Sequence, residues 1–284
     1  MFSDILLTVD CDHTLTDVQS VIPQRNLDAI RWFMERGGTF TVNTGRSVNT
    51  MSPFLDILPY NAPLLLFNGA VAYDRGSAAY CTPIDLPMWP TIEAVAKEFP
   101  EMNLEIQTMD NHYLVNEKPD FVEMYDYLGW GHAPAVFGAE LGPFIKFALF
   151  GAMTEGSLDD FYSATEEELA RFRYAADFIL SRWGDKVDIS FSAPRILDVQ
   201  AKGVNKLKAA RDLQQRVNKK ILVCVGDAQN DVVMLDGADY SFCPCDGVVA
   251  DRYPNVCSCD DGAVADVIYK KIPEILGLSL DIRK

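Results

Sequence analysis

The chain has 284 residues, of which 49% are hydrophobic and 23% are charged. This composition can bury a sizeable core, so it excludes a disordered or collagen-like protein, and the length predicts one large domain or a domain that carries an insert. The 25 basic and 41 acidic residues give a formal net charge of −16, which would repel nucleic acid and an anionic membrane surface. We therefore expect neither as a partner.

The N-terminal segment and the cysteines indicate the cellular compartment in which the protein is expected. No basic stretch precedes the first apolar run, and that run ends at Asp10, so a signal or transit peptide does not fit. No segment approaches the roughly 20 apolar residues of a membrane span. The seven cysteines are an odd number, which favours reduced thiols. These features predict a cytoplasmic protein.

The first third of the chain alternates strands and helices. Residues 5–9 are an apolar run that ends in acidic residues, as in a buried parallel strand. An amphipathic helix is expected after Pro23, up to Gly37 and Gly38. Further strands are predicted over 39–43 and 63–67, with a helical stretch to about residue 58 between them. This succession predicts a doubly wound parallel sheet.

The pattern changes over residues 84–187, where we expect a separate α+β insert that forms a cap. Two short strands around a turn at Asp110 and Asn111 predict a hairpin, and two strands at its end close the insert. The elements expected here are helices at 92–99, 121–128 and 157–183 and strands at 104–108, 112–116, 144–150, 187–191 and 195–199.

The α/β pattern then returns, so residues 1–83 and 188–284 are predicted to form the core. A helix is expected from Lys202 to about residue 217, followed by an apolar strand that ends in Gly226 and Asp227. The remaining predicted elements are a helix from 230 to 235, short strands at 240–243 and 255–258, and a closing amphipathic helix over 264–272.

Acidic residues follow two of the predicted core strands. Asp10 and Asp12 come directly after the first strand, and Asp227 follows the strand at 221–225, with Asn230 and Asp231 in the next turn. Carboxyl ends of parallel strands form the ligand-binding edge of such sheets. Carboxylates that converge there repel each other unless a cation lies between them, and hard oxygen ligands indicate Mg²⁺. The sequence therefore predicts a Mg²⁺ site.

Four motifs in order resemble those of the haloacid dehalogenase superfamily. Residues 10–15, Asp-Cys-Asp-His-Thr-Leu, resemble its Asp-x-Asp-x-Thr opening, and residues 226–235 resemble its acidic fourth motif. Thr44-Gly45-Arg46 looks like the second motif and Lys206 like the third, while Asn68-Gly69-Ala70 is typical of the Cof-like, type IIB branch. The resemblance implies a Rossmann-like core with an inserted α+β cap of the C2B type.

The resemblance also implies an activity, that of a Mg²⁺-dependent phosphatase of small phosphorylated metabolites, foremost sugar phosphates. Asp10 would attack phosphorus to form an aspartyl-phosphate, and Asp12 would act as general acid and base. The metal would be held by the Asp10 carboxylate, the Asp12 backbone carbonyl and Asp227, with Asp231 or Asn230 in support.

Substrate contacts are carried over in the same way. Thr44 and Lys206 would bind the phosphoryl group, with Lys202 and Lys208 as competing assignments for the lysine. Arg46 either touches the phosphate or pairs with a neighbouring acid. Asn68 either contacts substrate or belongs to an ordinary Asn-Gly turn.

The sequence departs from the family pattern at two places. One is His13, where the branch most often has Gly, and the other is the loop at 243–247.

Two alternative functions remain open. One is a phosphomutase or phosphotransferase of sugar phosphates, and the other is a non-catalytic module that binds a phosphorylated ligand. Two groups of residues outside the motifs also have two interpretations. The first group is four cysteines, which are either a zinc or redox site or, as their strand positions favour, buried inert thiols: Cys243, Cys245, Cys257 and Cys259. The second group is four aromatic residues, which either line a substrate pocket or pack the cap: Tyr125, Tyr127, Trp130 and Phe137.

Overall fold

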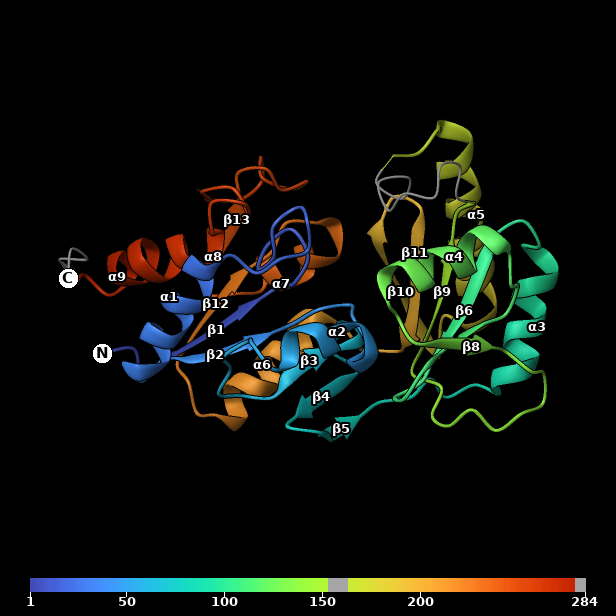
Figure 1. Ribbon diagram of the computed structural model, residues 1–284, viewed down its shortest axis with the longest axis horizontal. Helices are drawn as coiled ribbons and strands as arrows, with labels where there is room; N and C mark the ends of the chain where they lie inside the picture. The colour runs from blue at the N-terminus through green and yellow to red at the C-terminus, as the bar shows by residue number, and fades with distance from the viewer. Residues whose placement is uncertain (153–162, 279–284) are drawn as a thin grey trace. The chain divides into compact units, whose positions relative to one another are not determined.

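The computed structural model describes residues 1–152 and 163–278 (Figure 1). The chain forms two compact units. The first consists of Met1–Thr44, Phe54–Ala79 and Asn205–Lys284, and the second of Gly45–Pro53 and Tyr80–Val204. The predicted insert thus falls inside the second unit, which extends further than residue 187 and also takes in a segment near the N-terminus.

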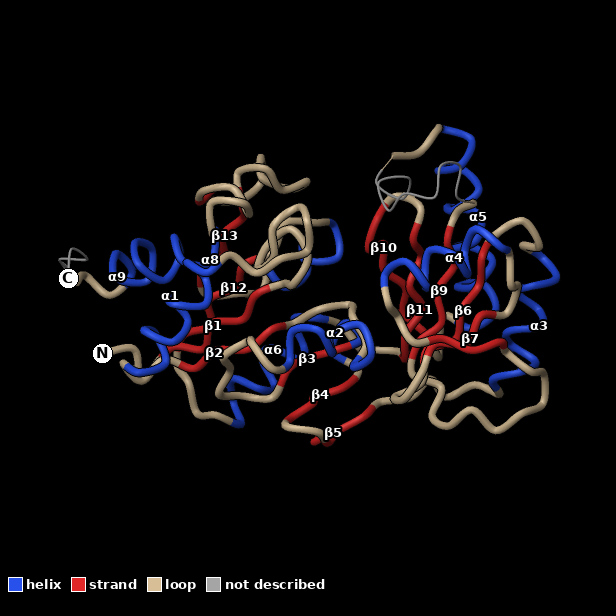
Figure 2. The backbone as a smooth tube through the Cα atoms, in the orientation of Figure 1, coloured by secondary structure: helices blue, strands red, loops and turns tan. Residues whose placement is uncertain are grey.

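The first unit is built on a fully parallel sheet of five strands in the order β14-β13-β12-β1-β2 (Figure 2). Strand β1 is buried along its whole length, as its continuous apolar sequence requires of a strand covered on both faces. It pairs with β12 on one side and β2 on the other, so the order of the strands reverses at β1. In such sheets the ligand-binding crevice lies at the carboxyl ends of the strands where the order reverses. The strands are β1 (Ile5–Val9), β2 (Thr39–Val42), β12 (Ile221–Val225), β13 (Tyr240–Pro244) and β14 (Asn255–Val256).

Helices complete this unit. Helix α1 buries Ile30 and Phe33, and its Asn26 ties two distant segments together by donating to the carbonyl of Leu15 and accepting from the N–H of Ala265. The predicted closing helix is present as three successive segments, with a π-helix at Val267–Lys271 in the middle. The helices are α1 (Gln24–Glu35), α6 (Lys206–Arg216), α7 (Val232–Asp236), α8 (Ala263–Asp266) and α9 (Ile272–Ile275).

The third predicted strand does not join the parallel sheet as expected. Strand β3 (Leu64–Leu66) instead begins a separate sheet in the order β3-β4-β5, and a lone parallel bridge joins its Leu65 to Asn43. The sequence reading missed β4 (Val71–Asp74) and β5 (Ser77–Cys81). Strand β5 is largely exposed, so it lacks the alternating apolar pattern by which a half-buried strand is recognised.

The second unit contains a six-stranded sheet in the order β10-β11-β9-β6-β7-β8. The predicted hairpin is present, with β6 and β7 antiparallel and Gln107 opposite His112. Strands β10 and β11 pair onward to β9, which is why the unit continues to Val204 and the predicted boundary at 187 is wrong. The strands are β6 (Asn103–Gln107), β7 (His112–Leu114), β8 (His132–Pro134), β9 (Lys146–Phe150), β10 (Val187–Ala193) and β11 (Ile196–Ala201).

Three long helices accompany this sheet: α3 (Met88–Glu98), α4 (Pro119–Leu128) and α5 (Glu166–Trp183). Helix α5 starts at a capping box on Thr165, and the predicted helical residues 157–162 lie outside the described part of the chain. A short helix, α2 (Val48–Leu55), begins within the Gly45–Pro53 segment.

The four aromatic residues with two interpretations lie in the second unit. Tyr125 is fully buried with ring contacts to Trp130 at 5.5 Å, whereas Tyr127 is 88% exposed. Phe137 contacts Trp89, with ring centroids 5.0 Å apart. Tyr125 and Trp130 therefore pack within the unit, whereas Tyr127 and Phe137, which is 52% exposed, are largely at the surface.

One face of this sheet carries a buried polar cluster. The Glu105 carboxylate accepts hydrogen bonds from the Gln107 amide and the Tyr125 hydroxyl and lies 3.1 Å from His112 Nδ1. On the adjacent strand β9, Lys146 forms a buried ion pair of 3.0 Å with Asp198 on β11. We call Glu105, His112, Tyr125, Lys146 and Asp198 the polar sheet face.

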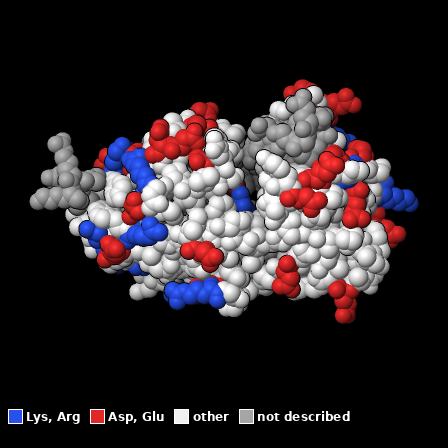
Figure 3. Space-filling view, in the orientation of Figure 1, with Lys and Arg blue, Asp and Glu red and all other residues white. Residues whose placement is uncertain are grey.

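The charge of the surface and the hydropathy of the helices agree with what the sequence predicts. Acidic side chains are spread over the visible surface of each unit (Figure 3). Among residues 1–152 and 163–278, no helix is long and apolar enough to cross a bilayer.

The polar sheet face allows a prediction of how the free energy of unfolding falls at acidic pH. Burial raises the pKa of Glu105, but His112, Lys146 and the Tyr125 hydroxyl more than offset burial, so the pKa lies below its ordinary value of 4.5. The unfolded chain then binds the proton more readily, so the stability that Glu105 contributes is complete above about pH 4.5 and is lost as the pH falls through the lower folded pKa. In urea unfolding between about pH 6 and pH 3, we expect Glu105→Gln to lose less stability than the wild type on acidification. Glu93→Gln, on the exposed side of α3, should keep the wild-type acid dependence, and an unchanged dependence in Glu105→Gln would contradict this account.

Candidate active site

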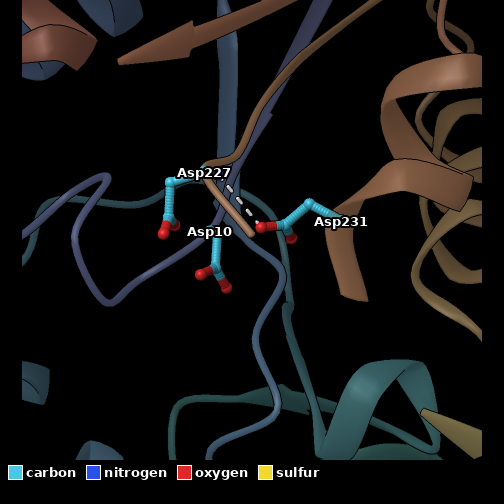
Figure 4. A group of neighbouring side chains, drawn as sticks. All are labelled: Asp10, Asp227 and Asp231. Atoms are coloured by element: carbon cyan, nitrogen blue, oxygen red, sulfur yellow. Dashed lines mark hydrogen bonds between the residues drawn. The ribbon is translucent and has the colours of Figure 1, made fainter. Parts of the chain in front are cut away.

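Three of the predicted acidic residues meet at the carboxyl edge of the parallel sheet. Asp10 directly follows β1, and Asp227 lies two residues beyond the end of β12. Because Val9 pairs with Val225, the two strands deliver both side chains to the same edge. Asp231 comes from the next turn of the chain, and one oxygen from each carboxylate lies within 4.8 Å of the others. Figure 4 shows Asp10 and Asp227 pointing the same way, with Asp231 facing them from the side.

Lys206 holds two of these acids together. Its Nζ donates to Asp10 Oδ1 and to Asp231 Oδ1, both at 2.6 Å, and the residue is 1% exposed. It is the first residue of α6, whose start is fixed by Asn205 accepting from the backbone N–H of Lys208.

The two competing lysines bond elsewhere. Lys202 pairs with Asp188 in the second unit, and Lys208 pairs with Asp212 on the surface of α6. Of the three lysines that the sequence left open, Lys206 is therefore the one that reaches the acidic residues.

Asp231 is fixed by the backbone as well as by the lysine. Its Oδ2 accepts from the N–H groups of Asp227 and Ala228, each at 3.1 Å; the dashed line in Figure 4 marks the bond from Asp227. Gly226 is required for this approach, because a Cβ there would lie 2.6 Å from the Asp231 side chain. Asp231 thus orients the loop that carries Asp227.

The charges in this cluster do not balance. Burial raises the pKa of Asp10 to about 7, with Asp231 adding repulsion that Lys206 partly offsets. Burial, then Asp231 and Asp10, raise the pKa of Asp227 well above its usual range. Burial lowers the pKa of Lys206, but Asp10 and Asp231 outweigh it, so the side chain remains an ammonium. One cation therefore faces three carboxylates.

The donor set fits the metal that the sequence predicted. In the described part of the chain, Asp10, Asp227 and Asp231 form the single group of three or more acidic, histidine or cysteine side chains close enough to share an ion. Carboxylate oxygens are the ligands of hard cations such as Mg²⁺, and a divalent ion would offset the excess negative charge. Asn230, the other candidate ligand, has a buried Oδ1 to which no described group donates.

Thr44 and Asn68 lie together in the first unit. Thr44 follows β2, and its N–H donates to the Leu65 carbonyl while its carbonyl accepts from the Asn68 N–H. Both residues are about 2% exposed. Asn68 has φ 56°, as the Asn-Gly turn interpretation requires. Arg46 belongs to the second unit, where its Nη1 donates to the Thr50 carbonyl.

The backbone accounts for the departure at His13. This residue has φ 52°, in the left-handed region where Gly is unstrained and where His is among the better tolerated side chains. The neighbouring Asp12 is partly exposed, and its charge contributes to the raised pKa of Asp10.

Two residues of the cluster were missed as site residues from the sequence. The hydroxyl of Thr14 donates to Asp227 Oδ1 at 2.9 Å, and Asn43 Nδ2 donates to the Lys206 carbonyl at 2.8 Å. Thr14 is the threonine of the opening motif, so its signal was present. Asn43 had a weaker one, a polar residue at the carboxyl end of a buried strand.

The four C-terminal cysteines are separate free thiols. Burial raises the pKa of Cys243 and of Cys259 to about 12, in agreement with the prediction of inert thiols. The prediction is wrong for Cys245, which is exposed, and Cys257 is partly exposed. Within the described residues the four do not form a metal-binding group.

The bridging lysine should be essential to the stability of the first unit. We expect Lys206→Met to lower the free energy of unfolding by about 3–5 kcal/mol, because it leaves buried carboxylates without their cation. Lys208→Met, whose ammonium is exposed beside Asp212, should change it by less than about 1 kcal/mol. Urea unfolding measures both, and equally small effects would contradict the assigned role of Lys206.

Comparison with known proteins extends the resemblance over most of the chain. Residues 7–244 match the family described as haloacid dehalogenase-like hydrolase. A protein named HMP-PP phosphatase from Yersinia enterocolitica is 26% identical over 235 residues, which cover 81% of this chain and 80% of that protein.

Solved structures share the fold. A haloacid dehalogenase-like hydrolase from B. subtilis superposes with a TM-score of 0.75 at 19% identity, over 93% of this chain and 99% of that one. A sugar phosphatase of subclass IIB superposes with a TM-score of 0.71 at 20% identity, over 96% and 98%. The predicted Rossmann-like core with an inserted cap is confirmed. The chain belongs to the haloacid dehalogenase-like hydrolases.

Proposed function

We propose that this protein is a Mg²⁺-dependent phosphatase that hydrolyses small phosphorylated metabolites, foremost sugar phosphates, through an aspartyl-phosphate. The observation that carries the proposal is the buried cluster in which Lys206 bridges Asp10 and Asp231 beside Asp227. These residues would supply a nucleophile, a phosphate-binding cation and a hard-metal donor set at one sheet edge. Similarity to proteins named HMP-PP phosphatase and sugar phosphatase supports the substrate class.

In the first step an Asp10 oxygen attacks phosphorus. The new O–P bond forms as the ester P–O bond breaks, and Asp12 gives its proton to the departing alcohol. The carboxylate of Asp10 must be ionised to attack, although burial and its acidic neighbours favour its protonation in the absence of a cation. Asp10, Asp227 and the Asp12 carbonyl, with Asp231 or Asn230 in support, would hold Mg²⁺, which would supply positive charge that favours the ionised form and offsets repulsion by the phosphate.

In the second step Asp12, now ionised, takes a proton from water, whose oxygen attacks phosphorus. The bond to Asp10 breaks, inorganic phosphate leaves, and both carboxyl groups return to their starting states. Lys206 already contacts Asp10, so its ammonium stands where it can bind a phosphoryl oxygen next to the nucleophile. The Thr44 hydroxyl would donate to another phosphoryl oxygen.

The nucleophile is tested directly by Asp10→Asn. We expect phosphate release from a panel of sugar phosphates in Mg²⁺ to fall by at least about 10³-fold, because an amide cannot form the acyl phosphate, and to stop in EDTA in the wild type. Asp4→Asn is the matched control, since Asp4 lies at the opposite end of β1 and pairs with Lys220 on the surface. Near-normal turnover by Asp10→Asn would end the proposal, and an isomerised sugar phosphate in place of free phosphate would indicate a mutase.

The acid role of Asp12 is tested by the choice of leaving group. Asp12→Asn should slow the release of an alkyl alcohol by about 10²–10⁴-fold, since the alkoxide then departs without a proton. The first step with an aryl phosphate should be much less affected, because a phenolate leaves without protonation. Pre-steady-state kinetics with both substrates measure the difference, and an equal loss for both would exclude Asp12 as the general acid.

A further inference from the structure

We propose that residues 45–49 form a positioning segment, held on the polar sheet face of the second unit, that fixes Thr44 for phosphate binding, with His112 as the positioning residue. This inference rests on the proposed function, which assigns phosphate binding to Thr44. The segment begins at the residue after Thr44, at the point where the chain passes from the first unit to the second.

The central anchor is a buried hydrogen bond between His112 and Ser47. His112 Nε2 lies 2.7 Å from Ser47 Oγ, and the two residues are 2% and 1% exposed. On its other side, His112 Nδ1 lies 3.1 Å from Glu105 Oε2 and 3.2 Å from the Tyr125 hydroxyl. A carboxylate can only accept, so Nδ1 carries a proton, which in the neutral ring leaves Nε2 to accept from the Ser47 hydroxyl.

Two further anchors hold the same segment. Lys146 Nζ, while paired with Asp198, donates to the Gly45 carbonyl at 3.1 Å. Asn49 exchanges two hydrogen bonds with the backbone of Gly131, at 2.9 and 3.1 Å. A Cβ at Gly131 would lie 2.7 Å from Asn49 Nδ2, so this contact requires glycine. Three of the five residues, Gly45, Ser47 and Asn49, are thus tied to β9, to β7 and to the loop before β8.

The anchored segment acts on Thr44 through the chain itself. Thr44 is held from the other side by the Leu65 carbonyl and the Asn68 N–H, and the planar peptide bond to Gly45 leaves it few ways to turn. With the backbone hydrogen bonds of Thr44 on one side and the anchored Gly45 on the other, the direction of the Thr44 Cα–Cβ bond is restricted, and with it the set of positions that the hydroxyl can take. Loss of the anchors would let the Gly45 peptide rotate, and a displacement of about 1 Å at a catalytic group is enough to slow turnover strongly.

Ser47, His112 and Glu105 also have the hydrogen-bond order of a nucleophile, base and acid, but the surroundings exclude that role. Ser47 Oγ accepts from the Thr50 N–H at 3.1 Å and so caps the start of α2. With Ser47 only 1% exposed, no substrate carbonyl can approach it. The three residues therefore serve to position the segment.

The test uses the full-length enzyme with a sugar phosphate. The amide of His112→Asn sits near the old Nδ1 and keeps a partner for Glu105, but it does not reach Ser47. We expect kcat/KM to fall on the order of tenfold, with the Mg²⁺ concentration for half-activation unchanged, because the metal ligands lie in the first unit. His112→Gln, whose amide extends to the Nε2 position, should restore most of the loss.

Two variants guard against a trivial loss of folding. Asn49→Ala removes a partly exposed anchor and should give a smaller loss of the same kind. Thr91→Val is the matched control, since it deletes a buried hydroxyl of the second unit that bonds only within α3 and its cap, to the Pro87 carbonyl. It should leave kcat/KM unchanged, and a loss equal to that of His112→Asn would overturn the proposal.

A double-mutant cycle with Thr44→Val then shows whether His112 acts through Thr44. If it does, adding His112→Asn to Thr44→Val costs little more, whereas independent losses multiply. Amide exchange of Asn68, whose N–H bonds to the Thr44 carbonyl, gives a readout that needs no turnover, and it should quicken in His112→Asn. Multiplicative losses or an unchanged Asn68 exchange rate would overturn the inference. A wild type without phosphatase activity would instead contradict the proposed function, and Asn68 exchange would still test the positioning role.

Discussion

The site depends on one buried ammonium group shared between two carboxylates. Lys206 bonds to Asp10 and Asp231 with almost no exposure to water, where an unpaired charge of either sign would be strongly destabilising. The third acid, Asp227, leaves the cluster with more negative than positive charge. Burial and, after it, repulsion between the carboxylates raise the pKa values of Asp10 and Asp227, and a divalent cation would offset the excess negative charge.

The backbone around this cluster is adapted to bring its members close. Gly69, at φ 97°, passes so near to the start of α6 that a Cβ would lie 2.9 Å from the Asn205 carbonyl, and the next residue is Lys206. Gly226 gives Asp231 the same kind of close approach. His13, in the left-handed conformation next to Asp12, is a further special backbone position beside the reacting groups, where such strain is often found.

In the second unit the buried acids have basic partners within the protein. On the polar sheet face, Glu105 lies against His112, and Lys146 against Asp198, so each acid has a basic partner within the protein. Such a cluster needs no ion to complete it and can instead specify geometry. The contrast gives the two units distinct roles in the proposed reaction, with chemistry in the first and the positioning of Thr44 through its chain neighbour in the second.

Sequence alone determined what depends on local pattern. The apolar runs that became β1 and β12, the acids after them and the spaced motifs identified the family fold and the cluster, because strand ends in a parallel sheet deliver side chains to one edge. Pairing and burial are not local, so only the tertiary structure decided which strands are neighbours: β3 left the parallel sheet, and β11 came to lie between β10 and β9. For the same reason it alone distinguished Lys206 from Lys202 and Lys208, and it brought Ser47 to His112, 65 residues away. Hydrogen bonds of this kind join segments that are far apart in the sequence and leave no periodic pattern in it. The sequence alone therefore could not predict them.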